Sequence, residues 1–292
     1  MWNYKIKNIL LDDILKYDKE KYNSNNHWIN DIRPSDYEFV LSQTQTSMWI
    51  NYFKEFQKIT INNSIWIEWL KQASEICCQT GKFSKIFLDE FDIIVKELNK
   101  KYGYLFNDCH KGFFVRVNNV SLKYGEHKEG PYNNIRNILE SIVSCIGSHS
   151  PLKYNTNEIN IYLIKWMDIK PEFEFRVFVF NNKITAISQQ NIYSVVYNNY
   201  LENENIFNEF MKKKLDIIVN YFYEEMIQKI TWISNYTFDF ALIKNNPYLI
   251  ELNSFGKEFA AGSALYHWLL DEKILYNDFS DNNFLIEFRY TI

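Results

Sequence analysis

Hydrophobic residues recur at two spacings along this chain, and the change of spacing separates a helix-rich part from a strand-rich part. Apolar residues at helical spacing predict helices over residues 12–22, 44–59 and 84–103. The last of these is expected to end at Gly103, a residue suited to a helix C-terminus. Residues 1–110 are therefore predicted to form a mixed, mostly helical region.

After residue 110, strand-like alternation becomes common. Strands are predicted within residues 112–125, 158–169, 172–190 and 235–255. Helices are predicted within residues 130–147, 205–230 and 263–276, with Pro131 near the start of the first and Ser263 as a possible cap of the last. Strand clusters separated by long helices indicate an α+β or mixed α/β fold.

Composition narrows the class of protein. The 292 residues are 47% hydrophobic with only eight glycines, enough for one large domain or for two lobes with a cleft between them. A net charge of −4 gives no basic footprint, so no nucleic acid partner is expected. No apolar run reaches the roughly 18 to 20 residues of a membrane span, and the charged start is unlike a signal peptide. Four cysteines without a CxxC pair predict reduced thiols and a cytoplasmic protein.

Arginine is scarce, yet one arginine interrupts an apolar strand. Only five of the 32 Lys and Arg residues are Arg, and Arg176 shares a strand face with Glu174. Two interpretations stay open. The pair is a solvated ion pair on an ordinary sheet surface, or Arg176 supplies a rigid fork of donors suited to phosphate and lines a cavity.

The turn after this strand sets which residues join that face. Asn181 and Asn182 suit a two-residue hairpin loop that needs positive φ. Phe180 would then pair with Lys183, and Gln189 would lie opposite Glu174. We therefore expect Gln189 on the face of Arg176.

A second hairpin carries oxygen-bearing side chains. Asp239 lies between two phenylalanines, and Glu251 and Asn253 are two residues apart on one strand face. A three-residue loop at 244–246 would place Glu251 opposite Asp239, whereas a two-residue loop would place Leu252 there. Two carboxylates and an amide suit Mg²⁺, whereas Zn²⁺ is not expected without a His or Cys pair. The alternative is outward-facing carboxylates balanced by solvent.

Five short segments, in order, resemble the motifs of the cell division cycle protein 123 family, a branch of the ATP-grasp superfamily. They read FFVRVNNVSLK, YLIKW, EFRVFVFNNKITAISQ, YTFDFA and ELNSFG, starting at residues 113, 162, 174, 236 and 251. The resemblance covers roughly residues 110 to 270. It implies an ATP-grasp-like α+β fold of two lobes with a nucleotide cleft, with 1–110 as a separate region, 111–165 in the small lobe and 166–292 as the large lobe.

The resemblance also implies ligand roles for particular residues. Arg116, in place of the family's first lysine, and Arg176 would contact phosphate. Lys165 and Trp166 would lie on the hinge strand that holds adenine. The residues implied to hold Mg²⁺ are Asp239, Glu251 and Asn253. The loop at 125–131 is either a flap over the phosphates that uses Lys128 or an ordinary surface loop.

The chain departs from the family pattern at several positions. The family's SQRD reads SQQN, which places Gln190 and Asn191 where the family has Arg and Asp, and Glu251 replaces an Asp. These changes spare the implied phosphate and metal ligands but weaken inferences about a protein partner.

Three functions are weighed. The resemblance implies an ATP- and Mg²⁺-binding assembly chaperone that binds the gamma subunit of translation initiation factor 2. The alternative is an ATP-grasp ligase or kinase that activates a carboxylate or transfers phosphate, and a third option is a nucleotide-free scaffold. The sequence offers no identifiable acceptor pocket, which favours the first.

Overall fold

The computed structural model describes residues 2–25, 27–28, 32–80, 83–107, 109–152, 157–200, 203–259, 261–277 and 285–292. Contacts group the chain into two compact units, one of residues 1–45 with 169–292 and one of residues 46–168. Each unit combines helices with a sheet, which confirms the α+β class. The three-part division expected from the sequence stays a prediction.

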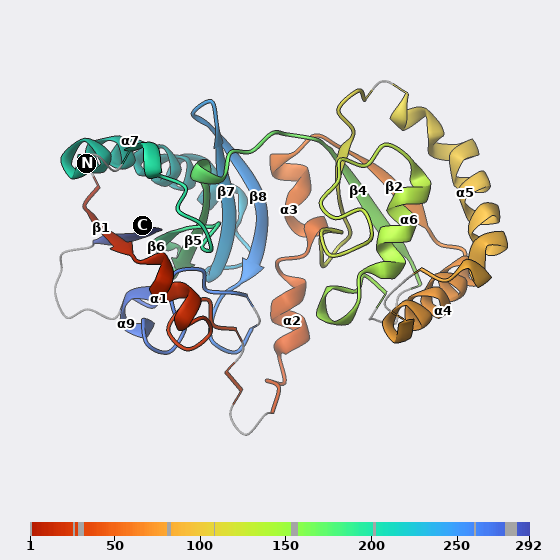
Figure 1. Cartoon of the computed structure of the whole chain (residues 1–292), viewed down its shortest axis with the longest axis horizontal. Helices are drawn as coiled ribbons and strands as arrows, with labels where there is room; N and C mark the ends of the chain where they lie inside the picture. Colours follow the sequence, from red (N-terminus) through yellow and green to blue (C-terminus); the bar gives the residue numbers. More distant parts are fainter. Residues whose placement is uncertain are drawn as a thin grey trace. The chain divides into compact units, whose positions relative to one another are not determined.

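The first unit contains a six-stranded sheet. Its strands lie in the order β1-β9-β6-β5-β7-β8. Their bounds are Tyr4–Ile9 (β1), Ile286–Thr291 (β9), Lys183–Gln189 (β6), Glu174–Phe180 (β5), Tyr236–Ile243 (β7) and Asn246–Ser254 (β8). β9 runs parallel to both β1 and β6, whereas β6, β5, β7 and β8 form antiparallel pairs. The two strands at the ends of the sequence are thus neighbours in space (Figure 1).

Helices of the first unit pack beside this sheet. They are α1 (Leu11–Lys16), α2 (Tyr37–Ser42), α7 (Glu204–Tyr221), α8 (Ile227–Lys229) and α9 (Glu272–Leu275). α7 begins where the Asn203 side chain accepts hydrogen bonds from the next turn, and it contacts β8. Phe178 from β5 packs against Tyr266 and Trp268, so the segment after β8 covers one face of the sheet.

The second unit contains a three-stranded antiparallel sheet in the order β2-β4-β3. The strands are Phe56–Ile61 (β2), Ile159–Lys165 (β4) and Phe113–Arg116 (β3). The helices are α3 (Thr46–Phe53), α4 (Ser64–Thr80), α5 (Leu88–Tyr102) and α6 (Ile135–Ser144). α4, α5 and α6 contact one another (Figure 1), and their apolar faces share one core with the sheet.

Short helical turns complete the structure. They are the 3₁₀ turns Lys85–Phe87, Gly103–Phe106, Gly147–His149, Pro171–Phe173 and Asn198–Tyr200 and the π-helical turn Phe222–Met226. Among the described residues, no helix combines the length and the apolar character that crossing a membrane requires.

Several predicted elements need correction. The helix predicted over 44–59 ends at Phe53. The end of the predicted segment belongs to strand β2, which pairs along its length with β4. The predicted helix over 263–276 shrinks to α9, and Ala264 near its expected start takes a positive φ of 48° that is incompatible with a helix. The Ser263 hydroxyl donates to the Tyr266 carbonyl at 2.5 Å and caps no helix. Helix α6 starts after Asn134, not near Pro131, because the Asn134 side chain is its cap.

Candidate functional site

The predicted turn at Asn181-Asn182 is confirmed. Both residues have positive φ, and Phe180 pairs with Lys183. A bulge between Phe178 and Val179 then shifts the rest of the register by one residue. The residues of β6 that lie opposite the first half of β5 therefore differ from those that the turn alone predicts.

The bulge corrects the expected position of Gln189. Gln189 pairs with Phe175, not with Glu174, and its side chain is buried toward β9. The next residue, Gln190, takes the predicted place. Its amide Nε2 donates to Asp239 Oδ2 at 3.1 Å, and its backbone N–H donates to the Glu174 carbonyl at 3.0 Å.

Arg176 and Asp239 form the centre of the candidate site. They lie opposite each other on β5 and β7. Arg176 Nε donates to Asp239 Oδ1 at 2.8 Å and Nη2 donates to Oδ2 at 2.7 Å, a two-point ion pair. A third donor, Nη1, reaches the Gly262 carbonyl at 2.5 Å. Arg176 is therefore held by a buried carboxylate on the neighbouring strand.

Burial of this pair is nearly complete. The side chains of Arg176 and Asp239 are 11% and 3% exposed. The pKa of Asp239 is raised to about 6. Burial is the main cause and the neighbouring carboxylate of Glu251 adds to it, whereas Arg176 lowers the pKa. The pKa of Arg176 stays high because the charge of Asp239 outweighs the effect of burial. Arg176 therefore stays charged, whereas its partner Asp239 is ionised mainly above about pH 6.

The second hairpin brings the oxygen donors together by an unexpected route. Lys244 and Asn245 form a two-residue turn with positive φ, so the expected three-residue loop is wrong. A bulge at Ile250 adds the missing residue, and Asp239 lies opposite Glu251 as expected. The pairing of Asp239 with Glu251 is thus produced by a turn that is one residue shorter than expected, followed by a bulge.

Asn253 lies two residues beyond Glu251 on the same strand face. Its amide Nδ2 is 3.4 Å from Glu251 Oε1, a long hydrogen bond. Within the described residues, no group of three or more His, Cys, Asp or Glu side chains is arranged to hold a metal. A metal would therefore need the two carboxylates together with the Asn253 amide.

This donor set suits a hard divalent cation. Asp239 and Glu251 are close enough that one carboxylate raises the pKa of the other, a repulsion that a cation between them would relieve. Asp239 Oδ2 accepts two hydrogen bonds, from Arg176 and Gln190, but Oδ1 accepts one and keeps a second lone pair for a cation. The chemistry of Asp239, Glu251 and Asn253 fits Mg²⁺, which favours oxygen ligands and retains some of its water.

The other residues implied by the resemblance lie in the second unit. Arg116 is 4% exposed, its Nε donates to the Thr46 hydroxyl at 3.3 Å, and its guanidinium carbon is 5.8 Å from the centre of the Trp49 ring. Burial lowers the pKa of Lys54 to about 6, and the charge of Arg116 contributes to this lowering. The guanidinium of Arg116 and the amine of Lys54 therefore influence each other beside α3.

Lys165 and Trp166 follow each other at the end of β4. Lys165 is exposed, and Trp166 is half-buried. The Trp166 backbone N–H donates to the Gly112 carbonyl at 3.0 Å, and its indole N–H donates to Asp168 Oδ1 at 3.1 Å. Both N–H groups of Trp166 are thus engaged within the protein.

The loop at 125–131 is tied to α6. The backbone N–H groups of Glu126 and His127 donate to the hydroxyls of Ser144 and Ser141 at 2.7 and 3.1 Å. Lys128 is exposed, with a φ of 54°, and its carbonyl accepts from the Tyr132 hydroxyl at 2.6 Å. These contacts favour an anchored surface loop, because two N–H groups that a phosphate flap would use are already bonded.

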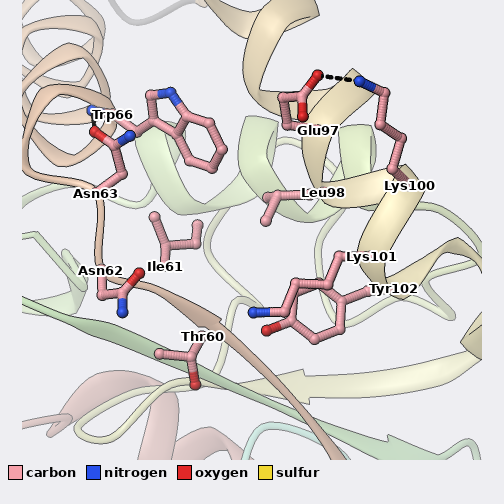
Figure 2. A pocket seen from close by; sticks show the side chains of 10 residues that line it. All are labelled: Thr60, Ile61, Asn62, Asn63, Trp66, Glu97, Leu98, Lys100, Lys101 and Tyr102. Carbon is pink, nitrogen blue, oxygen red and sulfur yellow. Dashed lines mark hydrogen bonds and ion pairs between the residues drawn. The ribbon is translucent and has the colours of Figure 1, made fainter.

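A pocket of about 450 Å³ lies elsewhere in the second unit, between the end of β2 and the helices α4 and α5 (Figure 2). Ile61, Leu98 and Trp66 line its apolar side. Among the polar residues around it, Glu97 pairs with Lys100 at 2.5 Å and the Asn63 side chain caps α4. None of the residues implied by the resemblance lines this pocket.

Sequence reasoning missed Gln190 and Gly262 as parts of the Arg176–Asp239 cluster. Gln190 follows directly after the strand, so a one-residue register shift was enough to hide it. Gly262 acts through its carbonyl, which carries no side-chain signal.

Comparison with known proteins gives three kinds of match. The D123 family model matches residues 67–291. A translation initiation factor eIF2 assembly protein from Candida albicans is 34% identical over 122 residues, and one from Vanderwaltozyma polyspora is 28% identical over 104 residues. These matches cover 40% and 35% of this chain, and span only 32% and 26% of the relatives' own lengths.

A solved structure supports the fold. Cdc123 from Schizosaccharomyces pombe is matched with a TM-score of 0.54 and 14% identity. The match covers 87% of this chain and 98% of that chain. At this identity the match shows a shared α+β fold.

Proposed function

The chain belongs to the D123 family, and from that premise we propose that it binds ATP with Mg²⁺ and acts as an assembly chaperone for translation initiation factor eIF2. Two relatives bear the name of eIF2 assembly proteins, which supports the role. The proposed partner is the gamma subunit of eIF2. The proposed place of action is the cytoplasm, where such a partner is made.

One observation carries the nucleotide part of the proposal. Arg176, Asp239 and Glu251 occupy directly opposed positions on three adjacent strands, so a fixed cation lies beside two carboxylates. Arg176 has five N–H donors and uses three of them within the described protein. The remaining donors suit a phosphate oxygen, which guanidinium groups bind in a fork.

The carboxylates and the amide would hold the metal. Asp239, Glu251 and Asn253 would supply its protein ligands, and bound Mg²⁺ would neutralise phosphate charge and orient the terminal phosphates. Arg176 fixes Asp239 in one orientation, and Gln190 supports it through the second oxygen. The protein's own contribution is thus a preorganised ligand rather than a flexible one.

The second unit supports the same proposal separately. Arg116 lies near the amine of Lys54, whose pKa is lowered to about 6 by burial and, to a lesser extent, by repulsion from Arg116, so this amine is largely uncharged at neutral pH. A bound phosphate would relieve this repulsion. Arg116 is braced by Thr46 and Trp49, so its guanidinium is held in one position.

Isothermal titration of the full chain with ATP, with and without Mg²⁺, tests nucleotide binding. Asp239→Asn and Glu251→Gln should each weaken Mg²⁺-dependent binding by at least about 10-fold, because each removes a charged ligand. The control is Glu209→Gln, since this exposed carboxylate pairs only with Lys212 on the surface of α7. Unchanged affinity in both site variants would refute the proposed metal ligands.

Capture of purified eIF2 gamma subunit, with and without ATP, tests the chaperone role. Nucleotide-dependent capture is expected. ATP turnover that rises with a carboxylate or amine acceptor and shows no dependence on the gamma subunit would instead support an ATP-grasp ligase or kinase.

A further inference from the structure

Thr237 in β7 carries a buried hydroxyl that the fold does not use. The residue is fully buried. Its Oγ1 has no hydrogen-bond partner within the part of the chain that the structure describes. Buried hydroxyl groups are normally bonded, so an unbonded one needs an explanation.

The position of Thr237 points to the candidate metal site. It precedes Asp239 by two residues, so both side chains project from the same face of β7. Across the sheet it lies directly opposite Asn253 on β8. Side chains of directly opposed residues have Cβ atoms only about 4.5 to 5.5 Å apart. The free hydroxyl therefore neighbours the amide that is proposed to bind Mg²⁺.

Packing alone does not call for threonine here. Valine has nearly the same shape and carries no polar atom to leave unbonded. On its other side Thr237 lies opposite Phe178, whose own side chain is apolar. The hydroxyl is thus a cost to the unliganded fold, and a ligand-bound role would account for it.

Asn253 supplies such a role. Its Nδ2 donates weakly to Glu251 Oε1, at 3.4 Å. If the Asn253 amide oxygen turns to a cation bound by Glu251, the amide nitrogen points away from that cation, because oxygen and nitrogen lie on different sides of the planar amide, and this donor loses Glu251 as its acceptor. A new acceptor is then required on the same strand face.

We propose that Thr237 is the positioning residue for Asn253, accepting the hydrogen bond from Asn253 Nδ2 when Mg²⁺ is bound and so aiming the amide oxygen at the metal. This inference rests on the proposed function. Thr237 would not bind the metal itself but would orient a residue that does. Loss of such an orienting residue typically lowers metal affinity by 10- to 100-fold.

The test compares Thr237→Val with Thr237→Ser in the full chain. The valine variant should be at least as resistant to urea as wild type without ligand, yet its Mg²⁺-dependent affinity for ATP should fall about 10-fold. The serine variant keeps the hydroxyl and should retain affinity within about 2-fold. Thr237→Ala serves if the valine variant does not fold, since it also removes the hydroxyl.

A matched control is available in β6. Thr185 is also a buried threonine, but its hydroxyl donates to the Leu275 carbonyl at 2.9 Å. Thr185→Val should lower the urea midpoint and leave ATP affinity unchanged. Loss of stability without loss of affinity at position 185, and the reverse at position 237, would show that the first hydroxyl stabilises the fold and the second supports ligand binding.

The outcomes are distinguishable. Wild-type protein that shows no Mg²⁺-dependent ATP binding would refute the proposed function and this inference with it. Wild-type protein that binds, together with a Thr237→Val variant that binds equally tightly, would refute only the inference. A valine variant that loses urea resistance and keeps full affinity would assign Thr237 to the fold.

Discussion

Arg176 and Asp239 lie 63 residues apart in the sequence, yet the guanidinium donates to both oxygens of the carboxylate across two neighbouring strands. The cation proposed for phosphate and the carboxylate proposed for metal are therefore a single buried unit. A substitution in either one therefore changes the environment of the other.

A double-mutant cycle measures this coupling. Arg176→Met and Asp239→Leu should each cost about 3 to 5 kcal/mol of unfolding free energy, because each leaves an uncompensated buried charge. The double variant should lose much less than the sum, since both charges are gone. Urea unfolding at neutral pH gives the three values. Additive losses would show that the two side chains do not depend on each other.

The two glutamines at the end of β6 should differ in importance. Gln189 is buried and bonds the carbonyls of Asn191 and Ser194 and the N–H of Thr291, whereas Gln190 makes one side-chain bond, to Asp239. Gln190→Met should cost about 1.5 kcal/mol, the low end for a bond to a charged group. Gln189→Met should cost more, because it leaves several buried groups without partners. The reverse order in urea unfolding would contradict this register.

The turn residue Lys244 should be replaceable with a gain in stability. It is exposed and has a φ of 52°, a conformation that disfavours side chains with a Cβ. Lys244→Gly should raise the unfolding free energy by about 0.5 to 1 kcal/mol. Lys244→Ala is the control, since it removes the charge but keeps the Cβ and should give no gain. A gain in both variants would trace the effect to the charge.

The acid stability of the first unit should depend on Glu287. Burial would raise the pKa of this carboxyl, but Arg289 and Lys5 outweigh burial and lower it. Arg289 donates to Glu287 at 2.7 Å, and Lys5 lies 2.9 Å from it. A lowered pKa in the folded state means that the stabilisation is complete above the unfolded value near 4.5 and is lost as the pH falls below it.

Glu287→Gln should therefore destabilise the protein at pH 7 and have a shrinking effect between about pH 5 and pH 3. Unfolding free energies measured across this range give the difference at each pH. Glu209→Gln is the control, because its pair with Lys212 lies on the exposed surface, where solvent screens ion pairs. A difference for Glu287→Gln that stays constant with pH would argue against the ionic role.

The sequence allowed the local parts of the site to be predicted. Asn181 and Asn182 tolerate the positive φ of a tight turn, so the first hairpin could be located from residue type. The opposition of Asp239 and Glu251 was also expected and is confirmed. Both predictions depend on residues close together in the chain, where turn chemistry and strand alternation act directly.

The bulges could not be predicted. Each inserts one residue, and one residue is enough to move a side chain to the opposite face of a sheet. Because of the bulge after Phe178, Gln190 rather than Gln189 lies on the face of Arg176. The bulge at Ile250 compensates for a turn that is shorter than expected. Nothing in the pattern of apolar and polar residues marks these positions.

Long-range pairing was missed for a different reason. β1 and β9 are short, and each has its partner at the other end of the sequence, so no local alternation reveals the pair. The buried ion pair between Arg176 and Asp239 has the same origin. Scarcity of arginine signalled that Arg176 was unusual, but only the order of strands shows which carboxylate it meets.

The position of β9 between β1 and β6 has a consequence for biosynthesis. β9 lies between β1 and β6, so β1 gains its sheet partner only after residue 291 has been added. The antiparallel strands from β5 to β8 can pair earlier, while β1 must wait with its edge uncovered. Nascent chains arrested before residue 286 should therefore be the form most dependent on protection by cellular holdases.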